Sequence, residues 1–178
     1  MSIILLLLRL PILVVHILVG LFTILFFPKE PKNFKNSHYR IMMLWMNILS
    51  SILGIKVDIR GIPDQSANLF VSNHVTYLDI IIINKLLPVN FIAKEEISSW
   101  PVIGRLASKT GTLFIKRGDN VESSKMIYEM EERFKLQNKI VFFPEGKIGN
   151  GKRVRKFHYK LFKSIENKEL YIQPIAIR

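Results

Sequence analysis

The sequence predicts an α/β fold: a mostly parallel central sheet flanked by helices, with an N-terminal membrane-anchoring helical hairpin. Three observations predict it. Apolar residues make up 49% of the 178 residues, and much of this apolar content falls within the first 55 residues. Beyond them, short apolar runs alternate with segments whose apolar residues recur at helical spacing, which is typical of strand–helix–strand units. Gly and Pro residues separate these runs and indicate turns.

The first predicted element is an apolar helix that ends at Pro28. Residues 10–27 include no formally charged side chain. At about 1.5 Å per residue this stretch reaches roughly 27 Å, which approaches the ~30 Å hydrocarbon core of a bilayer. Its end offers no small-residue cleavage site, so we expect an anchor rather than a removed signal peptide. Lys29, Lys32 and Lys35 follow, and such a basic flank predicts a cytoplasmic position for the domain.

The second predicted element is an apolar helix over residues 39–55. Its polar residues Arg40, Asn47 and Ser51 recur at helical spacing and form one narrow stripe. We predict that the two helices form a hairpin that spans the membrane or dips into one leaflet. The alternative is a buried hairpin in the core of a soluble protein.

The remaining elements follow from the period of their apolar residues. We predict strands at residues 56–60, 68–72, 90–93, 112–116, 139–143 and 170–177, and helices at residues 79–87, 97–109 and 121–137. The chain therefore divides into membrane-anchor helices at residues 1–55 and an α/β domain at residues 56–178. It stops at the end of a predicted strand, so we expect a C-terminally truncated fragment or a minimal member of its class.

Charge and cysteine content restrict the chemistry. The chain has 26 Lys and Arg against 14 Asp and Glu, a formal net charge of +12. Such a balance attracts nucleic acid, an anionic bilayer surface or phosphorylated substrates. The sequence has no cysteine, which excludes disulfides, thiolate metal sites and a Cys nucleophile. A Gly-x-Ser-x-Gly elbow is also absent, so we expect chemistry that needs no enzyme nucleophile.

The first candidate site is residues 73–79, Asn-His-Val-Thr-Tyr-Leu-Asp. The preceding strand brings His74 to the carboxyl edge of the sheet, where α/β proteins place ligands. A neutral histidine with a carboxylate on its other ring nitrogen is a general base with a fixed tautomer. Five residues of ideal helix separate side chains by about 140°, so His74 meets Asp79 only from the turn before the helix. Otherwise the two residues make no contact.

Two further strand ends carry polar residues. Lys116 and Arg117 end the strand that follows Gly111. An arginine there can hold a phosphate bidentately, and the lysine adds a charge, although a solvated strand end has the same pattern. Glu145 and Gly146 follow a later buried strand. We expect Glu145 to point into the same edge and orient a hydroxyl or a cation; an ordinary strand-to-helix turn is the alternative.

A basic stretch follows at residues 147–163. It has no acidic residue, and its cations are Lys147, Lys152, Arg153, Arg155, Lys156, Lys160 and Lys163. We expect Lys147, Arg153, Arg155 and Lys156 to contact the phosphates of a nucleotide-bearing donor or anionic lipid headgroups. A nucleic-acid patch has the same pattern.

The order of these blocks resembles the 1-acylglycerol-3-phosphate acyltransferase family of glycerolipid acyltransferases. The resemblance covers roughly residues 55–178, and the N-terminal hairpin is similar to the family's membrane anchor. Its four blocks are residues 73–79, residues 111–117, Phe-Pro-Glu-Gly at residues 143–146, and Ile-Gln-Pro-Ile-Ala at residues 172–176. Two departures leave the exact substrate open. Lys147 stands where the family usually has Thr or Ser, and residues 157–160 lack the glycine that the family often has.

The resemblance implies acyl transfer from an acyl thioester, either acyl-CoA or acyl carrier protein, to the free hydroxyl of 1-acylglycerol-3-phosphate. His74 and Asp79 would be catalytic, with backbone N–H groups after His74 stabilising the oxyanion. No cofactor or metal is implied. The substrate would contact Gly111, Lys116, Arg117, Glu145 and Gly146.

The expected partners are lysophosphatidic acid or another lysolipid, the thioester donor and a membrane, with the catalytic domain on the cytoplasmic face. We expect no nucleic acid. One alternative is a related acyltransferase that uses lyso-ornithine lipid or another lysophospholipid. A second is a membrane-tethered nucleic-acid-binding module, and a third is a catalytically inactive scaffold of the same fold.

Overall fold

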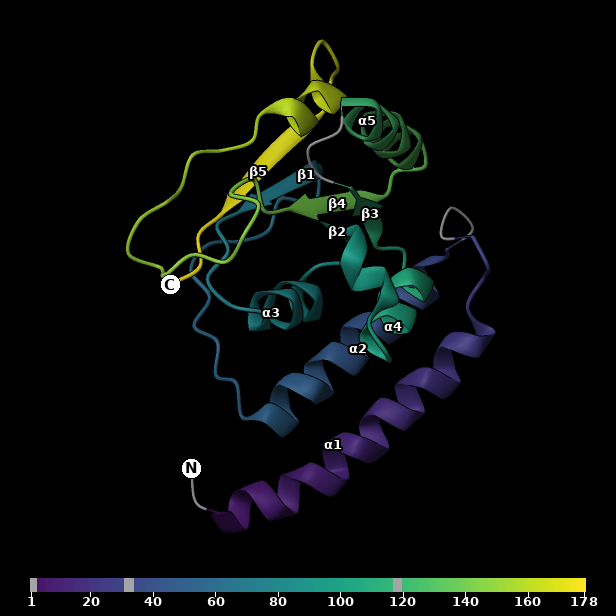
Figure 1. Ribbon diagram of the computed structural model, residues 1–178, viewed down its shortest axis with the longest axis vertical. Helices are drawn as coiled ribbons and strands as arrows, with labels where there is room; N and C mark the ends of the chain where they lie inside the picture. The colour runs from purple at the N-terminus through teal and green to yellow at the C-terminus, as the bar shows by residue number, and fades with distance from the viewer. Residues whose placement is uncertain (1–2, 31–33, 117–119) are drawn as a thin grey trace.

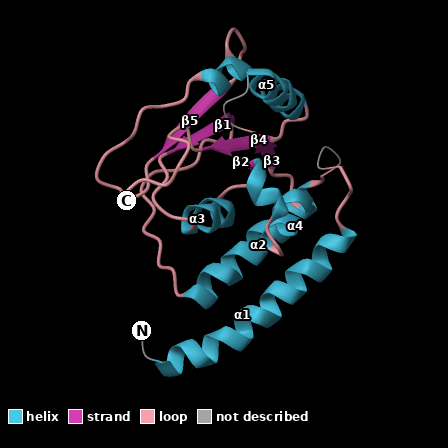
Figure 2. Ribbon diagram, viewed as in Figure 1, coloured by secondary structure: helices cyan, strands magenta, loops and turns pink. Residues whose placement is uncertain are grey.

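The computed structural model describes residues 3–30, 34–116 and 120–178, which form a layered arrangement around one sheet (Figure 1). One helix layer covers the upper face of the sheet, other helices cover the lower face, and the N-terminal helix lies outermost (Figure 2). The helices are α1 (Ile3–Thr23), η1 (Ile24–Phe26), α2 (Asn36–Leu53), α3 (Leu78–Leu86), η3 (Glu95–Ser99), α4 (Ile103–Lys109), α5 (Asn120–Lys135) and η4 (Lys160–Ile165).

The central sheet has five described strands in the order β3-β2-β4-β1-β5, and every pairing is parallel. They are β1 (Ala67–Ser72), β2 (Val89–Lys94), β3 (Leu113–Ile115), β4 (Lys139–Phe142) and β5 (Tyr171–Ile175). Phe70 lies opposite both Val141 and Gln173. This register brings the carboxyl ends of the central strands to one edge. The predicted parallel sheet flanked by helices is confirmed.

Each face of the sheet buries its own apolar cluster. On one face, Met130 of α5 packs against Leu69 and Ile140. On the other face, Ile83 of α3 packs against Phe70. Burying a side chain of this size contributes about 1.5–3 kcal/mol. These two clusters fix the positions of the strands whose ends form the candidate site.

The N-terminal hairpin is closed by a reciprocal contact between α1 and α2. The Trp45 indole N–H donates to the His16 carbonyl at 3.2 Å, and His16 Nε2 lies 3.1 Å from the Trp45 carbonyl oxygen. The two rings stack with centroids 4.5 Å apart. Gly20 allows this approach, because a Cβ there would lie 2.7 Å from Trp45 Nε1.

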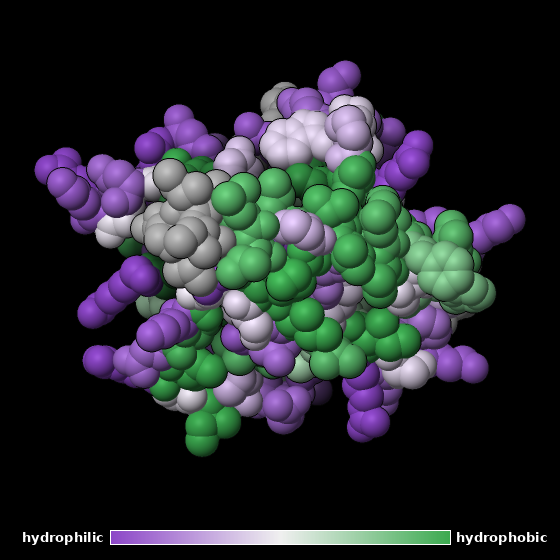
Figure 3. All heavy atoms as spheres, turned by 90° about the horizontal axis from the view of Figure 1, so that it is seen from below, coloured by the Kyte–Doolittle hydropathy of each residue, from purple (hydrophilic) through white to green (hydrophobic). Residues whose placement is uncertain are grey.

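The outer face of α1 is apolar and exposed. Figure 3 shows, from below, hydrophobic side chains gathered in a broad band, and α1 exposes a row of them that includes Leu7, Leu18 and Phe22. Among the described residues, one helix, Leu7–Phe26, is long and apolar enough to cross a membrane by length and composition. Exposed apolar surface of this extent is typical of a site of membrane or protein contact.

Helix α2 also belongs to the body of the domain. Its Tyr39 hydroxyl lies 3.0 Å from Asn90 Oδ1 and 3.2 Å from Asn138 Oδ1 in a buried cluster. Burial raises the pKa of Tyr39, which favours the protonated phenol that donates there. The division of the chain at residue 55 stays a prediction.

Helix α1 begins at Ile3, well before the predicted stretch at residues 10–27, and most of the remaining elements lie within a few residues of their predicted bounds. Two predicted elements are wrong. Residues 56–60 form no strand. An alternation of apolar and polar residues does not by itself provide a strand to pair with. The segment that follows is held near β5 by the Gln173 side chain, whose amide nitrogen donates to the Ile62 carbonyl and whose oxygen accepts the Asp64 N–H. Residues 97–109 form η3 and α4 rather than one helix. Pro101 and a γ-turn at Val102, with φ 64° and an Ile103 N–H to Pro101 carbonyl bond of 2.7 Å, separate them.

Candidate active site

His74 and Asp79 form a hydrogen-bonded pair at the carboxyl end of β1. The strand ends at Ser72 and α3 begins at Leu78, so His74 lies in the turn and Asp79 in the first helical turn. His74 Nδ1 is 2.7 Å from Asp79 Oδ2. The geometric condition set by the spacing is therefore met.

Asp79 is the rigid member of this pair. Its side chain is 0% exposed, against 13% for His74. The same oxygen, Oδ2, accepts the backbone N–H groups of Val75 at 2.8 Å and Thr76 at 3.0 Å. A carboxylate accepts hydrogen bonds, so it favours the tautomer with the proton on Nδ1 and leaves Nε2 as the basic nitrogen.

This arrangement restricts one expectation about the oxyanion. The N–H groups of Val75 and Thr76 stand where the sequence predicted oxyanion donors, but both are already bonded to Asp79. They order the carboxylate instead. The aspartate in the first helical turn therefore uses two of the N–H groups that precede its helix, and an oxyanion role for another N–H of this turn stays a prediction.

The turn after β4 lies against His74. The Phe143 ring stacks on the imidazole with centroids 4.0 Å apart and an interplanar angle of 13°. Glu145, which is 4% exposed, accepts the His74 N–H at 3.3 Å through Oε1 and the Arg155 N–H at 3.0 Å through Oε2. Gly149 donates its N–H to the His74 carbonyl at 2.7 Å.

Gly146 closes this turn in a conformation that favours glycine. Its φ is 72°, in the left-handed region, and its N–H donates to the Phe143 carbonyl at 3.0 Å. A side chain at that φ would be strained. Gly146 therefore shapes the turn that carries Phe143 and Glu145.

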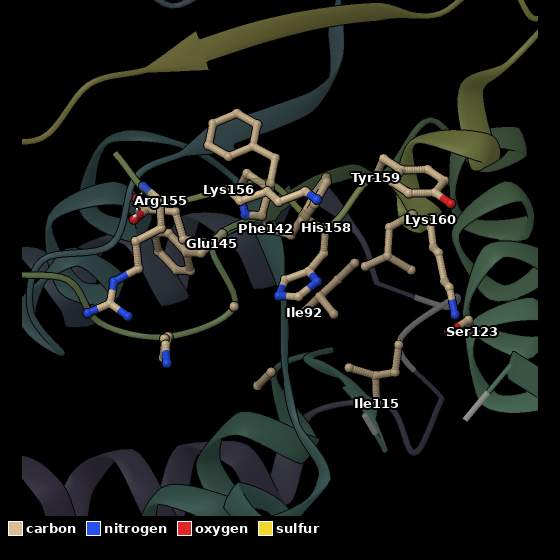
Figure 4. A pocket seen from close by; sticks show the side chains of 17 residues that line it. Ile92, Ile115, Ser123, Phe142, Glu145, Arg155, Lys156, His158, Tyr159 and Lys160 are labelled. Carbon is tan, nitrogen blue, oxygen red and sulfur yellow. Dashed lines mark hydrogen bonds between the residues drawn. The ribbon is translucent and has the colours of Figure 1, made fainter. Parts of the chain in front are cut away.

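A cavity of about 790 Å³ opens beside this turn (Figure 4). Its floor is largely apolar, formed by the ends of β2, β3 and β4 at Ile92, Ile115 and Phe142. Its cationic lining is Lys147, Arg155, Lys156 and Lys160. Phe143 lines the cavity and also stacks on His74, so it connects the cavity with the His74–Asp79 pair.

Not all predicted site residues gather here. The cavity is lined by five of the predicted residues, namely Glu145, Gly146, Lys147, Arg155 and Lys156. Arg153 is exposed and does not line it. Lys116 is exposed directly after the cavity residue Ile115. Gly111, with φ 88°, precedes β3, so the structure places it at the opposite, amino edge of the sheet. Arg117 lies outside the described residues.

Three site residues carried no predicted role. Phe143 and Gly149 contact His74, and Asn73 pairs its side chain with the Ile177 backbone through bonds of 2.7 and 2.8 Å. Phe143 and Asn73 each begin one of the sequence blocks, which was a usable signal. Gly149 had no signal beyond being a glycine in a loop. Within the described ranges, no group of three or more His, Asp or Glu residues is placed to hold a metal ion.

Comparisons with known proteins identify the family of this chain. The family described as Acyltransferase matches residues 55–178. A lyso-ornithine lipid O-acyltransferase from Pseudomonas aeruginosa is 35% identical over 138 residues, which is 78% of this chain and 53% of that protein. A 1-acyl-sn-glycerol-3-phosphate acyltransferase from Neisseria gonorrhoeae is 30% identical over 146 residues, 81% of this chain and 57% of that protein. The chain thus spans about half the length of the curated relatives it matches.

A solved structure has the same fold. The 1-acyl-sn-glycerophosphate acyltransferase from Thermotoga maritima superposes with a TM-score of 0.67 at 19% identity, covering 95% of this chain and 70% of that one. The family match covers the whole segment that holds the strand ends, the His74–Asp79 pair and the cavity. The chain therefore belongs to the acyltransferase family, within the group whose members include acyltransferases of lysophosphatidic acid and of lyso-ornithine lipid.

Proposed function

We propose that the protein transfers an acyl chain from an acyl thioester to the free hydroxyl of 1-acylglycerol-3-phosphate, giving phosphatidic acid. The donor is acyl-CoA or acyl carrier protein. The observation that carries the proposal is the 2.7 Å contact between His74 Nδ1 and Asp79 Oδ2. It leaves Nε2 for the substrate, since no described residue hydrogen-bonds to that nitrogen.

The proposed mechanism uses His74 as a general base. Nε2 takes the proton of the acceptor hydroxyl as its oxygen attacks the thioester carbonyl. The tetrahedral intermediate then collapses and expels the thiolate, which takes the proton back from the imidazolium. Asp79 keeps the ring oriented and stabilises its cationic form. A positioned base of this kind contributes about 10²–10⁴-fold to the rate.

The charges around the cavity support a phosphate-bearing substrate. Four cationic side chains line it, and its carboxylate, Glu145, already accepts two backbone N–H groups. Lys116 follows the cavity wall on β3 and adds a further charge near this edge. We propose Arg117, the next residue, as the bidentate phosphate contact.

A second candidate acceptor is lyso-ornithine lipid. The 35% identity with the Pseudomonas aeruginosa enzyme favours it. An ornithine headgroup has both an ammonium group and a carboxylate, however, so its net charge is near zero, and a cationic cavity attracts it less than it attracts a phosphate. We therefore place lysophosphatidic acid first and treat lyso-ornithine lipid as the alternative outcome of the test.

We propose that the protein acts at a membrane, with the catalytic domain on the cytoplasmic side. The exposed apolar face of α1 supports membrane association. A lysolipid acceptor lies in the bilayer, and a site held there avoids extracting it. The two soluble thioester donors are cytoplasmic, and the basic residue Lys29 follows α1.

The test is an acceptor panel with membranes that contain the protein. Acyl-CoA with a labelled acyl chain is incubated with lysophosphatidic acid, lyso-ornithine lipid and lysophosphatidylcholine, and the lipids are separated. A parallel series uses acyl carrier protein loaded with the same labelled acyl chain. We expect labelled phosphatidic acid to dominate. A product only from lyso-ornithine lipid would move the assignment to the second candidate. Salt-sensitive nucleic-acid binding with no acyl transfer would contradict both.

A further inference from the structure

We infer that the turn after β4 seats the catalytic histidine, with Phe143 and Glu145 acting as positioning residues rather than substrate ligands. The inference rests on the proposed function for its catalytic meaning. The geometric basis of the inference is independent of the proposed function. The turn contacts His74 at the ring and at the backbone N–H, and the loop that follows it contacts the His74 carbonyl.

The backbone of His74 is held by this turn at its N–H and by the loop after the turn at its carbonyl. Glu145 Oε1 accepts its N–H, and the Gly149 N–H donates to its carbonyl. The other oxygen of Glu145 accepts the Arg155 N–H at 3.0 Å, which holds the returning loop. One buried carboxylate thus joins the strand end of β1 to the loop after β4.

The imidazole ring is held in two independent directions. Asp79 bonds the Nδ1 edge and so fixes where Nε2 points within the ring plane. Phe143 stacks on the face and fixes the plane itself. Phe91 lies behind Phe143, with ring centroids 6.2 Å apart and an interplanar angle of 22°. The hydrogen bond to Asp79 alone would let the imidazole ring tilt, and the stack on Phe143 alone would let the ring rotate within its plane.

Glu145 is poorly suited to be a phosphate contact. Its carboxylate carries the same sign of charge as a phosphate, and the two repel each other. Its two oxygens are engaged by backbone N–H groups, and the side chain is 4% exposed. A role in holding His74 accounts for this burial and for both hydrogen bonds.

Steady-state kinetics separate the two roles. Glu145→Gln keeps one acceptor oxygen and loses the other, and Phe143→Leu removes the stacking face. For positioning residues we expect kcat to fall roughly 10- to 100-fold, because small misplacement of a reacting group has effects of this size. The KM for the acceptor should stay within about twofold of the parent value. Phe143→Tyr, which keeps an aromatic ring at this position, should have a kcat close to that of the parent. A raised acceptor KM with unchanged kcat would overturn the inference.

A spectroscopic measurement tests the seating without activity. In detergent-solubilised protein labelled with ¹⁵N-histidine, the hydrogen-bonded Nδ1–H of His74 is assigned by its loss in His74→Gln. We expect this signal to broaden or vanish in Phe143→Leu and Glu145→Gln and to persist in Phe143→Tyr. Phe157→Leu, which removes a ring from the same cavity, should leave it unchanged.

The two measurements keep the inference distinct from the proposed function. Melting curves first confirm that each variant is folded at the assay temperature. A signal that responds as expected in a protein without acyl transfer would sustain the seating and reject the proposed reaction. An unchanged Nδ1–H signal in folded Phe143→Leu and Glu145→Gln would overturn the seating, whatever the activity.

Discussion

Replacing Asp79 by asparagine isolates the charge of the buried carboxylate from its shape. The amide oxygen can take the place of Oδ2 and still accept from His74 and from the N–H groups of Val75 and Thr76. The amide nitrogen then replaces Oδ1, which has no hydrogen-bond partner among the described residues. The substitution therefore removes mainly the electrostatic support of the imidazolium.

The size of that support can be worked from the contact. Opposite charges about 4 Å apart attract by about 4 kcal/mol at an effective dielectric constant near 20. Each 1.36 kcal/mol corresponds to a tenfold change in rate. We therefore expect Asp79→Asn to lower kcat by roughly 10³-fold and to leave the KM for the acceptor unchanged, since Asp79 is buried away from the cavity.

The assay pairs this kinetic change with a stability measurement. Asp79→Asn should lower the free energy of unfolding by only about 1–2 kcal/mol, because its hydrogen bonds persist in neutral form. Asp79→Ala should cost more, since it leaves the partly buried N–H groups of Val75 and Thr76 without their carboxylate partner, at up to about 1–3 kcal/mol each. An Asp79→Asn enzyme with kcat within tenfold of the parent would refute the electrostatic role.

Three further substitutions test other parts of the account. Gly146→Ala should destabilise the protein by about 1–2 kcal/mol in urea unfolding, because φ is 72° there; an unchanged midpoint would contradict the left-handed turn. Tyr39→Phe should cost about 1–3 kcal/mol at neutral pH, since it leaves the acceptors on Asn90 and Asn138 unpaired. Burial raises the pKa of Tyr39 above its unfolded value, so this contribution is present below about pH 10 and is lost as pH rises through the folded-state pKa. Parent and Tyr39→Phe stabilities should therefore converge at alkaline pH, and a constant difference would contradict this. Arg117→Ala should raise chiefly the KM for the acceptor; weakened donor binding alone would exclude a contact between Arg117 and the acceptor's phosphate.

The sequence carried enough information to predict the succession of strands along the chain and the contact between His74 and Asp79. The spacing of apolar residues along the chain located the strands that end at Ser72 and Phe142. Parallel strands place their carboxyl ends at one edge of the sheet. The spacing of His74 and Asp79 demanded a turn before the helix, and the structure has one. These features follow from local patterns, which is why they could be predicted.

Features that depend on long-range contacts could not be predicted. Alternation at residues 56–60 gives no information about whether a partner strand is available, and none pairs with it among the described strands. The γ-turn at Val102 places a β-branched residue at positive φ, which no local propensity favours. The hydrogen bond between Glu145 and His74 joins residues 71 positions apart. A local sequence pattern gives no sign of such a contact, so the sequence predicted instead that Glu145 points to this edge of the sheet to orient a hydroxyl or a cation.

The most direct test of the central claim compares the parent protein with His74→Ala. Membranes containing each are incubated with labelled acyl-CoA and lysophosphatidic acid, or with lyso-ornithine lipid if the panel selects it, and the labelled product is quantified. We predict that His74→Ala lowers the rate by about 10²–10⁴-fold while the melting temperature stays close to that of the parent. Folded His74→Ala protein with parental activity would contradict the assignment of His74 as the general base.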